Sequence, residues 1–314
     1  MSSKTATVRL QADAAGIARA ADLLAQGGLV AVPTETVYGL AGRADRADAV
    51  AGIYAAKGRP SFNPLIVHVA DMEQAEKLAL FDARACLLAD RFWPGPLTMV
   101  LPLREGTGLA GAVTAGLPTL ALRSPAHPAM RVLLAQCDFP MAAPSANRSG
   151  WVSPTSADHV LATLDGRIDA VLDGGETERG LESTIIALRP EGGWSLLRPG
   201  PVTGAELRKV LGEAPLLAGG GVEAPGQLAQ HYAPGKPVRL NASYAEADEF
   251  LIGFGDVVGD CSLSESGDLA EAAARLYACL HQGADNDKQH IAVAPIPDAG
   301  IGAAINDRLR RAAS

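Results

Sequence analysis

The chain has 314 residues, 48% of them apolar, and a net charge of −8, and this length suits two domains better than one. No window approaches the roughly 18 to 20 consecutive apolar residues of a membrane span, and the N-terminal residues lack a signal-peptide pattern. The four cysteines (Cys86, Cys137, Cys261 and Cys279) have no metal-like spacing and suggest neither a disulfide scaffold nor a zinc site. We therefore expect a cytoplasmic protein without a metal site of its own.

The negative charge is concentrated toward the C-terminus. From Arg239 onward there are 6 Lys and Arg against 12 Asp and Glu, and the preceding residues have 21 against 23. Neither part has the basic excess of a nucleic-acid-binding domain. Direct binding of tRNA or DNA is not expected, although a basic cleft could still exist within a nearly neutral total.

Helix and strand signals alternate in the first part of the chain. Asp13 is expected to cap a helix that ends near Gln26. Further helices are predicted at 47–56, after Asp71, and at 127–136, 157–164 and 204–210; strands are predicted at 29–32, 65–69, 97–101, 120–122, 171–172, 184–188 and 195–197. The closely spaced strands near Ile186 and Leu196 indicate an antiparallel pair. We predict an α/β domain with a twisted, mixed parallel and antiparallel sheet.

The composition changes between residues 212 and 237, where Gly, Pro and Ala dominate. Such a stretch is typical of an interdomain linker. After it, strands at 238–240, 250–254 and 291–296 and helices at 269–282 and 303–312 predict a smaller α/β unit. The expected division is a larger domain at 1–211, a linker at 212–237 and a small C-terminal domain at 238–314.

The run from Val32 to Val69 combines hydroxyl and cationic side chains. A Pro-Thr-Glu-Thr turn follows a predicted strand, and Lys57 and Arg59 follow a predicted helix. Cations at that position also favour the negative end of a helix dipole, so an ordinary charge pair is an equal alternative. Being two residues apart, both side chains can instead converge on one anion, which favours a phosphate or carboxylate site.

A second polar loop spans 143–150. Ser145 and Asn147 are alternate residues, so their side chains share one face if the segment is extended. An ordinary turn is the alternative, since Ser, Asn and Gly are common in turns. Ser153 lies in a further hydroxyl-rich turn that enters a helix capped by Ser156, and helix N-termini favour phosphate.

Three strand ends add candidate residues. Arg123 and Arg198 each end an apolar strand, where a cation is more often placed for a ligand or paired with a carboxylate than left without a role. Ser183 lies at the start of a strand and can present a hydroxyl to the same place. His68 ends another apolar strand, where a histidine satisfied within the core is the commoner outcome and ligand contact is the alternative.

Several well-known catalytic patterns are missing from the sequence, among them the GxxxxGK[ST] phosphate loop, HExxH and GxSxG. A site of cations and hydroxyls indicates catalysis by positioning and charge stabilisation, as phosphoryl and nucleotidyl transfer require.

Together these residues resemble the YrdC-type threonylcarbamoyl-AMP synthase (L-threonylcarbamoyladenylate synthase) family in its long, two-domain form. The matching stretches are PTETVYGL, KGRPSFNPLIVHV, FWPGPLT, TLALRSPAHP, APSANRSG, ESTI and LLRPG, in this order, with a similar linker, PGQLAQHYAP, and tail. The resemblance covers nearly the whole chain. It departs from the family at Gln227, where methionine is usual, and at Ser124, where an apolar residue is typical.

The resemblance implies a YrdC-like sheet domain followed by a smaller Rossmann-like domain. It also implies a reaction in which L-threonine, bicarbonate and ATP give threonylcarbamoyl-AMP and pyrophosphate, with Mg²⁺ carried by ATP. A separate transferase would then use the product to modify a tRNA adenosine. No direct contact with nucleic acid or membrane is implied.

Residue roles also follow from the resemblance. The catalytic residues would be Lys57, Arg59, Ser145 and Asn147. Threonine would be bound by Thr34, His68, Arg123, Ser183 and the backbone of Ala143. ATP would be bound by Arg59, Asn63, Thr119, Ser145, Ser153 and Arg198, and by His231 or Tyr232 of the linker, which would close over the nucleotide as a lid.

Two other functions remain as alternatives. A carbamoyl-transfer module, as in hydrogenase maturation proteins, uses a similar domain, but those proteins are longer and carry zinc-binding cysteines. An RNA-binding regulatory protein is the non-enzymatic alternative, against which the acidic balance argues.

Overall fold

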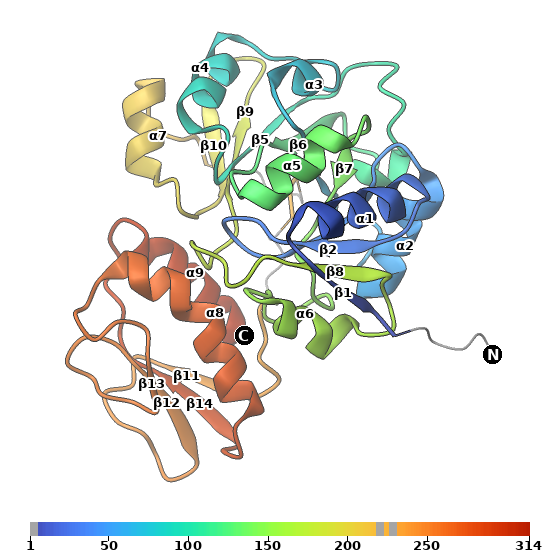
Figure 1. Ribbon diagram of the computed structural model, residues 1–314. Coiled ribbons are helices and arrows are strands. Elements are labelled where there is room, and N and C mark those ends of the chain that lie inside the picture. The colour runs from blue at the N-terminus through green and yellow to red at the C-terminus, as the bar shows by residue number, and fades with distance from the viewer. Residues whose placement is uncertain (1–5, 218–222, 226–230) are drawn as a thin grey trace.

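The computed structural model describes residues 6–217, 223–225 and 231–314, which form two sheets, each with helices packed against it (Figure 1). The larger sheet has ten strands in the order β1-β8-β2-β3-β7-β4-β6-β5-β9-β10. Their bounds are β1 (Val8–Gln11), β2 (Val30–Val32), β3 (Gly39–Arg43), β4 (Ile66–His68), β5 (Leu97–Pro102), β6 (Thr119–Arg123), β7 (Met141–Ala142), β8 (Ala170–Asp173), β9 (Thr184–Leu188) and β10 (Trp194–Arg198).

The large sheet is mixed, as predicted. Strand β4 runs parallel to β6 and antiparallel to β7. Strands β9 and β10 form the expected antiparallel pair, in which Ile186 lies opposite Leu196. The pairing of β4 with β6 also places His68 opposite Arg123. These two candidate residues, distant in sequence, are therefore neighbours at the ends of adjacent strands.

Helices cover both faces of this sheet. Their bounds are α1 (Ala14–Ala25), α2 (Ala47–Lys57), α3 (Met72–Glu76), α4 (Ala83–Phe92), α5 (Pro128–Gln136), α6 (Ala157–Leu164) and α7 (Gly204–Leu211), with a 3-10 turn η1 (Gly111–Val113). Alternate residues of a strand face opposite sides, so Val30 and Val32 pack with α1 and α5 while Ala31 packs in the core that includes α2, α4, α6 and α7. Asp13 caps α1 as expected, accepting from the Gly16 N–H at 2.8 Å.

The second sheet is small and entirely parallel, in the order β11-β14-β12-β13. Its elements are β11 (Val238–Leu240), β12 (Glu249–Gly253), β13 (Cys261–Ser262), α8 (Leu269–Asp285), β14 (His290–Val293) and α9 (Gly302–Ala312). A parallel sheet with helices packed on it is the arrangement of a Rossmann-like domain, which confirms the expected second α/β unit.

The two sheets are joined by a continuous apolar contact. In Figure 1, α8 and α9 lie on the side of the small sheet that faces the larger domain. The core of the small domain includes Val37, Val152 and Leu181 of the larger one, together with Tyr232. Apolar side chains of both domains are therefore buried against each other, and this contact holds the domains together in addition to the chain that links them.

The expected linker lies only partly within the described residues. In the described part of 212–237 the backbone forms isolated bridges, such as that between Ala233 and Trp151, and no helix or strand. Gln227 lies outside the described residues. The boundaries at 211 and 238 remain a prediction. No helix within the described segments is both long and apolar enough to cross a membrane.

A glycine at the contact between the domains provides a test of how tightly they are joined. Gly180 has a φ of +67°, and a Cβ there would come within 2.3 Å of the Ala274 carbonyl oxygen of α8. Gly175 has a φ of +80° with nothing within 4 Å of an added Cβ. Both substitutions by alanine incur left-handed strain of about 1–2 kcal/mol, but only Gly180→Ala must also displace α8, at a further cost of about 1–3 kcal/mol.

We therefore expect Gly180→Ala to lower the free energy of unfolding clearly more than Gly175→Ala, as measured by urea titration. Equal losses in the two variants would show that the domains do not resist separation at this contact.

Candidate active site

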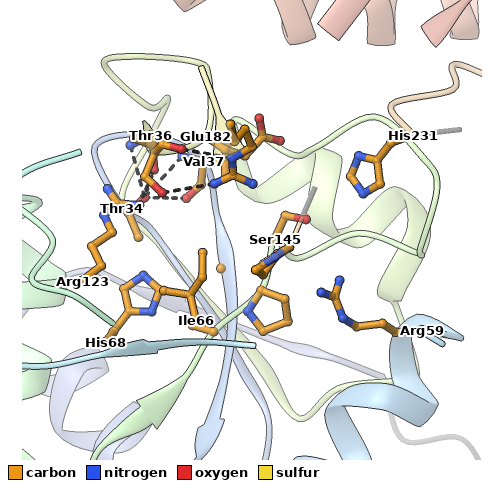
Figure 2. Close-up of a pocket in the computed structure, with 16 residues that line it drawn as sticks. Thr34, Thr36, Val37, Arg59, Ile66, His68, Arg123, Ser145, Glu182 and His231 are labelled. Carbon is orange, nitrogen blue, oxygen red and sulfur yellow. Dashed lines mark hydrogen bonds between the residues drawn. The ribbon is translucent and has the colours of Figure 1, made fainter. Parts of the chain in front are cut away.

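One cavity brings together most of the candidate residues from distant parts of the chain (Figure 2). Its lining includes the turn after β2, the ends of β4, β6 and β10, the loop after β7 and two residues of the linker region. The sixteen lining residues are Thr34, Thr36, Val37, Gly39, Arg59, Ile66, His68, Arg123, Ala143, Pro144, Ser145, Glu182, Ser183, Arg198, Pro225 and His231. In Figure 2, Arg123 and His68 lie at one end, Arg59 and His231 at the other, and Ser145 between them.

All five residues expected to bind threonine line this cavity, namely Thr34, His68, Arg123, Ala143 and Ser183. The Arg123 guanidinium is held in place by three acceptors. It donates to Glu35 Oε1 at 2.6 Å, to Thr36 Oγ1 at 2.9 Å and to the Gly95 carbonyl at 3.2 Å. Burial would raise the pKa of the Glu35 carboxyl, but the charge of Arg123 together with hydrogen bonds from Arg123 and from backbone N–H groups lowers that pKa. The pair is therefore ionised and nearly inaccessible to water.

His68 is a neutral ring in this structure. It is buried, and burial together with the charge of Arg123 lowers its pKa to about 3. Its Nδ1 atom has no hydrogen-bond partner. The commoner outcome for such a residue, a core histidine whose ring nitrogens are hydrogen-bonded, is therefore not found at Nδ1 of His68.

Ser183 and Arg198 form a second fixed group on the wall of the cavity. The Arg198 guanidinium donates to the Ser183 carbonyl at 3.0 Å and to Ser183 Oγ at 3.1 Å. The same hydroxyl is 2.7 Å from Thr98 Oγ1. A serine at the start of β9 therefore sets the position of an arginine at the end of β10.

Arg59 reaches the cavity from the loop after α2. Its guanidinium donates to the carbonyls of Asn63 and Pro64 at 3.1 and 2.8 Å. Burial lowers its pKa to about 10, so the side chain is still a cation at neutral pH. Backbone carbonyls hold it without neutralising its charge.

Lys57 and Arg59 have different partners in this structure, and their expected convergence on one anion remains a prediction. Lys57 belongs to the last turn of α2, and its ammonium donates to the carbonyls of Ser145 and Asn147. It is not part of the cavity lining. Gly58, with a φ of +60°, turns the chain between the two cations, so that only Arg59 is directed to the cavity. Burial lowers the pKa of Lys57 well below its usual value.

The loop at 145–147 is bent rather than extended, so the expected common face of Ser145 and Asn147 is not formed. Ser145 lines the cavity, whereas the Asn147 amide donates to the carbonyls of Arg148 and Trp151 at 2.9 and 2.8 Å. What the two residues share is Lys57, which binds both of their carbonyls.

Four of the eight residues expected to bind ATP line the cavity, and four do not. Arg59, Ser145, Arg198 and His231 are in the lining, while Asn63, Thr119, Ser153 and Tyr232 are not. Asn63 lies in the loop before β4, where its carbonyl accepts from Arg59, and Thr119 is the first residue of β6. Ser153 donates to Glu182, and Tyr232 is fully buried beside His231.

Buried polar atoms without partners concentrate among the candidate residues. Within the described part of the chain, eight buried side-chain atoms have no hydrogen-bond partner, and five of them belong to candidate residues: Asn63 Oδ1, His68 Nδ1, Asn147 Oδ1, His231 Nδ1 and Tyr232 OH. Because buried polar groups are normally hydrogen-bonded, this concentration marks the region as one that can accept a polar ligand.

Sequence reasoning missed three polar or charged residues at the site. Thr36 and Glu182 line the cavity, and Glu35 is the partner of Arg123. Glu35 and Thr36 lie one and two residues after Thr34, and Glu182 directly precedes Ser183. The predicted residues Thr34 and Ser183 therefore already pointed to the two segments that contain the missed ones. The described residues contain no group of three or more His, Cys, Asp or Glu that could hold a metal ion. Ser124 is buried and accepts a hydrogen bond from Arg131.

The cavity is small. Its volume is about 40 Å³, far below the roughly 300–1,000 Å³ of most small-molecule sites. Pro225 and His231 of the linker region form part of its wall. Residues around the cavity must therefore move before a ligand of nucleotide size can enter.

Comparisons with known proteins agree with the two-domain division of the fold. A family described as "Telomere recombination" (Sua5, YciO and YrdC) matches residues 22–200, and the family "Threonylcarbamoyl-AMP synthase, C-terminal domain" matches residues 202–314. The chain is 41% identical to the threonylcarbamoyl-AMP synthase of Bacillus subtilis strain 168, over 95% of this chain and 92% of that protein.

Solved structures give the same result. The crystal structure of Pyrococcus abyssi Sua5 complexed with L-threonine matches with a TM-score of 0.89 at 37% identity, over 98% of both chains. Full-length HypF in a phosphate- and nucleotide-bound form matches with a TM-score of 0.53 at 22% identity, over 59% of this chain and 30% of that one. The second likeness concerns the fold alone.

The buried histidines make the stability of the protein dependent on pH. Burial lowers the pKa of His68 and of His231 to about 3, below the value of about 6.5 in an unfolded chain. Protonation therefore favours unfolding, and the stability that each neutral ring contributes is present above about pH 6.5 and is lost as the pH falls toward 3. We expect His68→Gln to reduce the loss of unfolding free energy between pH 6.5 and 4.5 by up to about 1.4 kcal/mol per pH unit.

Urea titrations at pH 7, 6 and 5 measure this slope, and His290→Gln, in an exposed histidine, is the control. An unchanged slope in His68→Gln would mean that His68 is protonated in the folded protein.

Proposed function

The chain belongs to the threonylcarbamoyl-AMP synthase family in its two-domain form, and we propose that it condenses L-threonine, bicarbonate and ATP into threonylcarbamoyl-AMP and pyrophosphate. The observation that carries this proposal is the single cavity in which hydroxyl groups and three buried arginines, Arg59, Arg123 and Arg198, face one another. A zwitterionic amino acid and a polyphosphate are the ligands that such a lining suits.

The reaction needs two bond-forming steps. The threonine amine adds to bicarbonate, which loses water and gives a carbamate. A carbamate oxygen then attacks the α-phosphorus of ATP, and the bond to the β-phosphate breaks as pyrophosphate leaves. Negative charge accumulates on the phosphoryl oxygens in the second step, so fixed cations in a site with little water lower its barrier.

Arg123 is the proposed anchor for the threonine carboxylate. A guanidinium has five N–H groups, and three of them are engaged by Glu35, Thr36 and Gly95. Two therefore remain for a carboxylate. Thr34 supports recognition of the side-chain hydroxyl, because it too lies in the lining and already bonds to Thr36 Oγ1 and the Val37 carbonyl. A site built to bond a hydroxyl rejects analogues that lack it.

Arg59 and Arg198 are proposed to bind the ATP phosphates, with Ser145 and His231 alongside. Burial lowers the pKa of both guanidinium groups, yet they are held mainly by carbonyl and hydroxyl oxygens. Their charge is therefore available for an anion. Mg²⁺ is proposed to arrive with ATP and would supply further charge neutralisation at the phosphates.

Lys57 and Asn147 receive a different role from the one that their motifs imply. Lys57 binds the carbonyls on both sides of Ala146, and Asn147 binds the carbonyls that follow it. We propose that they shape the loop that presents Ser145 to the cavity, and that direct contact with substrate would require the loop to rearrange.

The remaining expectations are part of the same proposal. The four predicted ATP-binding residues that do not line the cavity are proposed to support the ATP site indirectly: Asn63, Thr119, Ser153 and Tyr232. The product would pass to a separate transferase that modifies tRNA, and the reaction would take place in the cytoplasm, where threonine, bicarbonate and ATP are all available.

The activity is tested by incubating the full chain with threonine, bicarbonate and MgATP and by measuring pyrophosphate together with the adenylate by mass. We expect product only when all three substrates are present. Pyrophosphate release that does not depend on threonine, or the absence of any adenylate, would refute the proposal.

Arg59→Met tests the proposed phosphate contact. Loss of one fixed charge contact commonly reduces kcat by roughly 10²–10³-fold, so we expect kcat/KM for ATP to fall at least 100-fold while the circular dichroism spectrum is retained. Lys77→Met is the matched control, because Lys77 is exposed and pairs only with Glu73 among the described residues. A rate within threefold of the wild type in Arg59→Met would remove Arg59 from the mechanism.

A further inference from the structure

A carboxylate lies among the cations of the cavity. Glu182 is buried, lines the cavity and directly precedes Ser183. An anion at this place opposes the binding of any polyphosphate and attracts the nearest arginine. Its charge must therefore be compensated by something other than the substrate-facing cations if these are to stay available.

The compensation comes from the C-terminal domain. Glu182 Oε2 accepts from Arg308 Nε at 2.9 Å and from the Tyr277 hydroxyl at 2.8 Å. Glu182 Oε1 accepts from Ser153 Oγ at 2.5 Å. Both carboxylate oxygens are thus occupied, and two of the three donors lie on α8 and α9. Burial would raise the pKa of Glu182, but the charges of Arg308 and Arg198 together with the hydrogen bonds from Ser153 and Arg308 lower that pKa to about 2.

Arg308 also reaches the residue that follows Arg198. It is fully buried, and its Nη2 donates to the Pro199 carbonyl at 3.0 Å while Nη1 donates to Asp307 at 2.7 Å. One side chain from the small domain therefore holds Glu182, two residues before β9, and Pro199, the residue after β10. Between these two points lies the hydrogen-bonded pair of Ser183 and Arg198.

The same guanidinium contacts the linker. The Arg308 guanidinium lies over the ring of Tyr232, 5.3 Å from the ring centroid. Two aromatic rings also lie against Tyr232: Tyr277 is stacked on it with 5.6 Å between the ring centroids, and the centroid of His231 is 4.1 Å away. His231 lines the cavity. Arg308 thus supports the cavity wall on two sides, through Glu182 and through the aromatic ring beside His231.

We propose that Arg308 of the C-terminal domain is a positioning residue for the ATP site: it holds the Glu182 carboxylate, so that Arg198 stays free for the phosphates. This inference rests on the proposed function, because it assumes that a polyphosphate binds at Arg198. Without Arg308, Glu182 would turn to Arg198 as its remaining nearby cation, and ATP would have to compete with an internal carboxylate.

The test uses the binding of MgATP to the full chain, measured by calorimetry, in a cycle of variants. We expect Arg308→Met to weaken ATP binding at least tenfold. Adding Glu182→Gln should restore the affinity to within about threefold of Glu182→Gln alone, because the anion that captures Arg198 is then gone. Rescue of this kind depends on charge, and a merely structural contact would not show it, since the double variant restores no contact.

Two further variants complete the cycle. Arg310→Met removes an exposed arginine from the same helix and should leave ATP binding unchanged. Tyr277→Phe removes one hydrogen bond to Glu182 and should weaken binding less than Arg308→Met does. If Arg308→Met does not fold, Arg308→Gln is compared with Arg308→Gln/Glu182→Gln, because glutamine also lacks the charge but keeps N–H donors, and we expect the same weakening and the same rescue.

The outcomes separate this inference from the proposed activity. Wild-type affinity in a folded Arg308→Met variant, or failure of Glu182→Gln to restore binding, would overturn the positioning role. A wild-type protein that binds ATP but forms no adenylate would refute the activity, and the binding cycle would still decide the role of Arg308. If the wild type binds no ATP, both are wrong.

Discussion

The burial of positive charge beside one small cavity is the constraint on which the rest of this structure depends. Lys57, Arg59, Arg123 and Arg198 are all nearly inaccessible to water, and a buried charge is tolerated only with partners of good geometry. The four cations find such partners in three ways. Arg123 pairs with a carboxylate, Lys57 and Arg59 bind backbone carbonyls, and Arg198 binds a serine that the small domain holds in place through its neighbour.

These solutions explain why the site needs so many parts of the chain. The acceptors come from the turn after β2, the loop before β4, the loop after β7 and the residue before β9, so the cations can be buried only when these segments are correctly packed. As a result, the positive charges at the cavity lie where there is little water, and electrostatic interactions are stronger there than at the surface. Because backbone carbonyls carry no net charge, Arg59 keeps its attraction for an anion while its geometry is fixed.

Much of the local structure follows from short-range chemistry. Asp13 was identified as a helix cap and Asp71 as the residue before a helix, and each accepts a backbone N–H in the structure. Most predicted strands were found within one or two residues of their ends, although the strand predicted at 291–296 ends at Val293. Strand β3 (GLAGR) was missed because two glycines weaken its strand signal, and β7 was missed because two residues carry no periodicity. Helix α4 was missed although Asp82 caps it.

The sequence by itself determined the helices, most strands, the mixed sheet, the second domain and the residue types of the site, since these depend on neighbours a few positions apart. The tertiary structure decided which candidates share the cavity. Lys57 and Arg59 are two residues apart, yet a left-handed Gly58 sends only one of them to the cavity. Glu182 and Arg308 are 126 positions apart, and no local pattern relates them. Their pairing depends on how α9 packs against the larger domain, and that packing forms only when the whole chain folds.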